Sequence, residues 1–145
     1  MDKKITLTKA QNAEIARDFQ TAVRLYKELL RDEPDNLEYL SAIGSNYVKA
    51  NEDEKALPFY QKIIDLFPHS ISAMNSMGGI YRRLKRYDES VEILKKALEE
   101  NKEPGTLNYT LGFTYREMGK FDEGIECFEI VVNENPNDVL AYNHQ

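Results

Sequence analysis

The sequence contains no tryptophan, one cysteine and two histidines among its 145 residues. The single cysteine, Cys127, cannot form a disulfide within the chain, which is compatible with a reducing compartment. The histidines, His69 and His144, lie far apart and have no Glu or Cys at metal-ligand spacing, so the sequence predicts no metal site and no cofactor. There is also no run of about 18 apolar residues. We therefore expect no signal peptide, no direct membrane insertion and a cytoplasmic location.

Basic residues are fewer than acidic ones, and the formal net charge is −6 at pH 7. Binding to a nucleic-acid backbone requires clustered Lys and Arg, so we expect no nucleic-acid partner for the surface as a whole.

The sequence also lacks a recognisable set of catalytic residues. Gly78 and Gly79 are not part of a phosphate-binding loop motif, and Cys127 has no neighbouring histidine that would activate it. No pair of carboxylates is set apart as acid and base, so the sequence predicts that the protein is not an enzyme.

A repeat of 34 residues dominates the sequence. The segment 40–47 returns in variant form at 74–81 and again at 108–115. A glycine recurs at this spacing, a tyrosine follows it three residues later, a small residue stands twelve positions after it, and a large apolar or aromatic residue stands sixteen positions after it. The residues concerned are Gly44, Gly78 and Gly112, then Tyr47, Tyr81 and Tyr115, then Ala56, Ser90 and Gly124, then Tyr60, Leu94 and Phe128. A fixed period of this size indicates units that stack on their neighbours.

These residues resemble the tetratricopeptide repeat family. Its unit is a pair of antiparallel helices, with Leu-Gly and Tyr in the first helix, Ala and an aromatic residue in the second, and a closing proline. The resemblance implies an all-α fold, a right-handed α-solenoid of antiparallel helix pairs, and one domain over residues 1–145. We expect repeats at about 3–36, 37–70, 71–104 and 105–138, with 139–145 opening a further helix. The first repeat diverges, because Ala10 replaces the glycine.

Local signals predict how some helices begin. Pro34, Asp35 and Asn36 end one unit and supply capping side chains for the next helix, and Ser70 is a candidate N-cap after Pro68. Pro58 lies inside a predicted second helix, where a proline removes a backbone donor and clashes with the preceding turn. We expect a bend or an irregular first turn there.

The resemblance also implies a binding surface. In this family the first helices line the concave side, and the second, fifth, ninth, twelfth and thirteenth unit positions tend to face the groove. Among the residues at these positions, the predicted peptide-binding groove consists of Ser41, Ser45, Lys49, Asn75, Arg82, Arg83, Tyr109, Phe113 and Arg116. Arginine binds carboxylates at two points, and asparagine can bind a peptide amide. We therefore expect a non-catalytic protein-interaction scaffold whose partner segment carries acidic and apolar residues.

Other interpretations stay open at this stage. The arginines could be solvated or paired with nearby acids such as Glu38 and Glu117. The chain could be the repeat arm of a larger protein with a downstream catalytic domain, or a small secretion-type chaperone. It could also form a homo-oligomer through its C-terminal face, where Phe128, Val131 and Val132 have no obvious cover. The fold alone does not choose among these functions.

Overall fold

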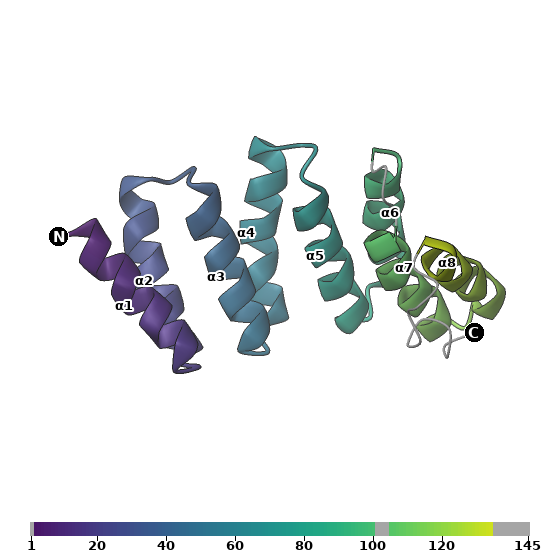
Figure 1. Ribbon diagram of the computed structural model, residues 1–145, viewed down its shortest axis with the longest axis horizontal. Coiled ribbons are helices and arrows are strands. Elements are labelled where there is room, and N and C mark those ends of the chain that lie inside the picture. The colour runs from purple at the N-terminus through teal and green to yellow at the C-terminus, as the bar shows by residue number, and fades with distance from the viewer. Residues whose placement is uncertain (1, 101–104, 135–145) are drawn as a thin grey trace. The chain divides into compact units, whose positions relative to one another are not determined.

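A computed structural model describes residues 2–100 and 105–134 of the chain. These residues form eight α-helices and no strand (Figure 1). The helices are α1 (Lys3–Ile15), α2 (Phe19–Asp32), α3 (Leu37–Lys49), α4 (Asp53–Leu66), α5 (Ile71–Arg83), α6 (Tyr87–Leu98), α7 (Gly105–Glu117) and α8 (Phe121–Glu134). The predicted all-α fold is confirmed. The further helix expected at 139–145 lies outside the described residues.

The contacts divide the chain into two compact units, Met1–Pro68 and His69–Gln145. In the first unit α1 packs on α2, α2 on α3, and α3 on α4. In the second unit α5 packs on α6, α7 packs on both of them, and α8 packs on α7. Within each unit, consecutive helices thus contact one another, as stacked helix pairs require. The single domain over residues 1–145 stays a prediction. No helix in the described ranges combines the length and the hydropathy that crossing a membrane requires.

Two helices begin at the predicted capping residues. Oδ1 of Asn36 accepts a hydrogen bond from the N–H of Tyr39 at 3.1 Å, and Oγ of Ser70 accepts one from the N–H of Ala73 at 3.4 Å. Both N-caps are therefore confirmed, since each side chain satisfies a backbone donor of the first turn. Pro58 lies inside α4, as expected. The bend there stays a prediction.

The repeating glycine of each first helix lies against the large residue sixteen positions later. A Cβ at the glycine would overlap that residue in its present position, so the glycine allows the large side chain to lie directly against the backbone of the first helix. A Cβ added to Gly44 would lie 2.8 Å from a ring carbon of Tyr60, one added to Gly78 would lie 2.6 Å from Cδ2 of Leu94, and one added to Gly112 would lie 2.8 Å from Cε1 of Phe128. The divergent first repeat has Ala10 and Tyr26 at these positions, and both are buried.

Every first helix is followed by a residue with a positive φ. The four residues recur at the repeat spacing and are Arg17 (60°), Asn51 (63°), Lys85 (64°) and Gly119 (82°). At the end of α5, the N–H of Lys85 donates to the carbonyl of Arg82 at 2.9 Å, and the N–H of Arg86 donates to the carbonyl of Tyr81 at 2.8 Å. This pair of bonds is the Schellman motif, and the same pair closes α1, α3 and α7. In three of the four repeats, the carbonyl of the repeating tyrosine accepts one of these bonds.

We predict that Gly78→Ala lowers the free energy of unfolding by about 1–3 kcal/mol, because overpacking of this kind forces neighbours to move. The new methyl group would lie 2.6 Å from Cδ2 of the fully buried Leu94. Gly79→Ala is the matched control. A Cβ there would lie 3.5 Å from Nη1 of Arg83, an ordinary contact, and alanine favours the helix by about 1 kcal/mol. Urea unfolding followed by circular dichroism measures both. Equal stability of the two variants would show that the close approach is not required.

A second prediction concerns the turn after α7. Gly119→Ala should cost about 1 kcal/mol, because an L side chain is strained in the left-handed region. The φ of Gly119 is 82°, and no atom of the described residues lies within 4 Å of an added Cβ, so packing plays no part. Lys85→Gly, at the same position of the previous repeat, should stabilise or be neutral. Denaturation curves of the two variants test this, and a Gly119→Ala protein as stable as the parent would contradict it.

Candidate functional site

The predicted groove residues lie on three first helices. Those on α3, in the first unit, are Ser41, Ser45 and Lys49; those in the second unit are Asn75, Arg82 and Arg83 on α5 and Tyr109, Phe113 and Arg116 on α7. The spacing of four places the α3 residues on one helical face. Both serines are half-buried and Lys49 is exposed. The side chains that the structure brings into contact with one another belong to α5 and α7.

Phe113 is the centre of these contacts. Its ring centroid lies 4.8 Å from Cζ of Arg116 and 5.9 Å from Cζ of Arg82, distances at which a guanidinium is attracted to a ring face. Tyr109 meets Phe113 edge-on with centroids 4.9 Å apart, and Phe128 meets it edge-on at 5.2 Å. We call Arg82, Tyr109, Phe113 and Arg116 the arginine cluster. Phe128 packs against the repeating glycine of α7, so the contact that closes the last helix pair also supports this cluster.

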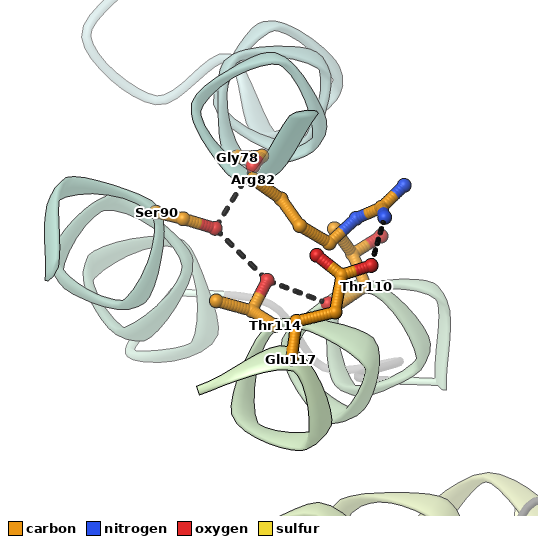
Figure 2. Close-up of polar contacts among 6 residues, drawn as sticks. All are labelled: Gly78, Arg82, Ser90, Thr110, Thr114 and Glu117. Atoms are coloured by element: carbon orange, nitrogen blue, oxygen red, sulfur yellow. Dashed lines mark hydrogen bonds and ion pairs between the residues drawn. The ribbon is translucent and has the colours of Figure 1, made fainter. Parts of the chain in front are cut away.

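Arg82 also forms an ion pair within the chain. Its Nη1 lies 2.7 Å from Oε1 of Glu117, and the two side chains are 25% and 31% exposed (Figure 2). This pair joins α5 to the end of α7. Nε of Arg82 is buried and has no hydrogen-bond partner within the described part of the chain. The sequence left open that the arginines pair with nearby acids such as Glu117. Arg82 does form such a pair. Arg83 is exposed, with its Nη1 near Gly79.

A buried polar network joins α5, α6 and α7 (Figure 2). Oγ of Ser90 lies 2.8 Å from the carbonyl oxygen of Gly78 and 3.0 Å from Oγ1 of Thr114, which lies 3.0 Å from the carbonyl oxygen of Thr110. Two hydroxyl protons serve three contacts, so two of the three can be hydrogen bonds at any moment. Oγ1 of Thr110 also lies 2.9 Å from Oδ1 of Asn75, which joins a predicted groove residue to α7. This network was not predicted from the sequence.

Other polar features of the second unit lie outside the arginine cluster. Nδ1 of the exposed His69 lies 2.7 Å from Oε2 of Glu100. Arg86 makes two contacts of 2.7 Å to the carboxylate of Glu89. An open depression of about 460 Å³ is lined by Lys85, Arg86, Tyr87, Asp88, Glu89, Glu117 and Met118. In the part of the chain that the structure describes, no three His, Cys, Asp or Glu side chains are grouped so that they could hold a metal ion.

The C-terminal face differs from the expectation. Phe128 and Val131 are buried, so the prediction that they lack cover was wrong, although Val132 is partly exposed. The exposed large apolar side chains of α8 are Phe121, at 62%, and Ile130, at 40%. A homo-oligomer formed through this face stays a prediction.

Comparisons with known proteins agree with the helix pairs. Two family models, each described as tetratricopeptide repeat, match residues 7–71 and 81–143. A crystal structure of MamA is 26% identical over 93% of this chain and 79% of that chain, with a TM-score of 0.85. MamA residues 41 to the end from Desulfovibrio magneticus RS-1 are 22% identical over 99% of this chain and 82% of that chain, with a TM-score of 0.88. YrrB, described as a TPR protein with an unusual peptide-binding site, is 19% identical over 92% of this chain and 69% of that chain, with a TM-score of 0.82. A comparison with curated proteins gives no match.

The environment of Cys127 predicts that its thiol reacts slowly. The side chain is buried, and this burial, with a contribution from Glu126, raises the pKa of the thiol to about 11. Because the thiolate is the reactive form, the folded protein at pH 8 should react with Ellman's reagent far more slowly than the protein unfolded in urea. The absorbance of the released thiolate measures both rates. Rapid, stoichiometric labelling of the folded protein would contradict the buried placement.

Proposed function

The chain belongs to the tetratricopeptide repeat family, and on this basis we propose that it is a non-catalytic scaffold that binds an acidic and apolar segment of a partner protein. Members of this family bind proteins or peptides. The preference for an acidic and apolar segment rests on the arginine cluster. In this cluster, guanidinium groups from two first helices, α5 and α7, lie near the ring of Phe113. Such a surface suits a segment in which carboxylates and apolar side chains are close together.

Each part of the cluster has a chemical role in this proposal. Arginine presents several N–H donors in a planar fork, which matches the two oxygens of a carboxylate. The rings of Tyr109 and Phe113 are half-buried, and an apolar side chain of the partner would cover the area that they still expose. Asn75 accepts a hydrogen bond from Thr110 through Oδ1, so its NH₂ group is the donor for a peptide carbonyl.

The proposal extends to α3 through the repeat register. Ser41, Ser45 and Lys49 occupy the same unit positions in their repeat as Asn75, Gly79 and Arg83 occupy in the next. The hydroxyl groups of the serines are able to hydrogen-bond to a peptide backbone, and Lys49 carries a positive charge. A peptide is also the class of ligand named in the description of YrrB.

The test uses a synthetic peptide that alternates glutamate with leucine, and a counterpart in which glutamine replaces glutamate. We predict that the parent protein binds the glutamate peptide more tightly and that the triple variant Arg82→Gln, Arg83→Gln, Arg116→Gln loses at least about tenfold in affinity. Added salt should weaken binding by the parent, because exposed charges are screened over about 8–10 Å near physiological ionic strength. Fluorescence anisotropy measures the dissociation constants.

The matched control removes three positive charges elsewhere in the second unit. Lys95, Lys96 and Lys120 are exposed and lie outside α5 and α7, so their change to glutamine should leave the affinity within about twofold of the parent. Circular dichroism checks that both triple variants are folded. If both lose affinity equally, net charge rather than the arginine cluster governs binding. If the parent does not distinguish the two peptides, the acidic preference is wrong.

A further inference from the structure

One repeat reverses the charge at a predicted groove position. The thirteenth position of the second, third and fourth repeats holds Lys49, Arg83 and Glu117 respectively. The preceding position holds Arg82 in the third repeat and Arg116 in the fourth. The last residue of α7 is thus acidic where the equivalent residues are basic. A carboxylate there is also disfavoured by the negative end of the helix dipole, so its position calls for a specific partner.

That partner is Arg82. The carboxylate of Glu117 contacts its guanidinium in the way that a carboxylate of an acidic ligand would. Oε1 of Glu117 lies 2.7 Å from Nη1 of Arg82, on the same side chain that faces the Phe113 ring. A carboxylate that used both oxygens could engage Nη1 and Nη2 together, whereas the hydrogen bond to Glu117 joins Nη1 to Oε1. The pair therefore uses part of the donor fork of Arg82 and leaves a stronger arrangement for another carboxylate.

We propose that Glu117 is an intramolecular competitor that occupies the carboxylate-binding position of Arg82 until an acidic ligand displaces it. This inference rests on the proposed function and adds a specificity-determining residue to it. Both side chains of the pair are part-exposed, so solvent replaces the lost contact at small cost and displacement is feasible. The competitor raises the threshold for binding, because a carboxylate of the ligand must replace the carboxylate of Glu117 before it can contact Arg82.

The experiment measures the same glutamate peptide against Glu117→Gln. We expect its affinity to rise about 1.5-fold to fivefold over the parent, which is the range that removal of a part-exposed charge pair allows. The affinity for the glutamine peptide should stay unchanged. Glu92→Gln is the matched control, because it makes the same charge change at an exposed position of α6. A further pair, Arg82→Gln with and without Glu117→Gln, completes a double-mutant cycle.

The outcomes separate this inference from the proposed function. A gain that appears with Glu117→Gln, is absent with Glu92→Gln and vanishes in the Arg82→Gln background supports the competitor. If the parent prefers the glutamate peptide but Glu117→Gln binds it no better, the competitor is wrong and the proposed function stands. A gain that persists without Arg82, or that Glu92→Gln reproduces, also overturns the competitor. If neither the parent nor Glu117→Gln prefers the glutamate peptide, both proposals fail.

Discussion

The close approach of the two helices of a pair, at the repeating glycine, is the contact on which the rest of the structure depends. On α7 this glycine lies against Phe128, and Phe128 also lies edge-on to Phe113, the ring that both cluster arginines face. The order of dependence runs from backbone to surface. Gly112 leaves space for the ring of Phe128, and Phe128 packs against Phe113. The ring of Phe113 in turn contacts the guanidinium groups of two arginines. A change deep in the helix pair would therefore reach the candidate site through packed side chains, because protein interiors are densely packed and transmit strain.

Much of the fold could be predicted from the period of the sequence, because that period reflects packing within each pair. The glycine and the residue sixteen positions later recur together since each determines the space available to the other. The turns were harder to predict. All four first helices end in a Schellman motif, yet only Gly119 and Asn51 are of the residue types that commonly adopt the left-handed conformation there. Arg17 and Lys85 adopt the same backbone despite their side chains. There, tertiary packing and two hydrogen bonds outweigh the local preference.

The candidate site was less predictable than the fold. Repeat register indicates which positions of a first helix tend to face outward, but it does not indicate how side chains of different helices pair. Arg82 and Glu117 occupy different unit positions, so no rule based on equivalent positions finds their contact. Glu117 is the residue that we propose modifies this site. From the sequence it is predicted only to be an acid that could pair with an arginine. Its orientation relative to Phe113 and Arg82 required the positions of α5 and α7 in space.

The buried network around Ser90 shows how one helix can distinguish among similar helices of neighbouring repeats. Packing alone distinguishes poorly between helix pairs that share the same glycine and the same large residue, and repeat proteins are prone to misassembly for this reason. Ser90 stands where the other repeats have Ala22, Ala56 and Gly124, and its hydroxyl is satisfied by α5 and by Thr114 of α7. The residue equivalent to Thr114 on α5 is Ile80, which offers no hydrogen-bonding side chain. The contact between Ser90 and Thr114 is one that isoleucine at the equivalent position could not make, so α6 packs more favourably against α7 than it would against a first helix without a hydroxyl there. A polar pair in the core thus specifies one neighbour where the repeat pattern alone would accept several.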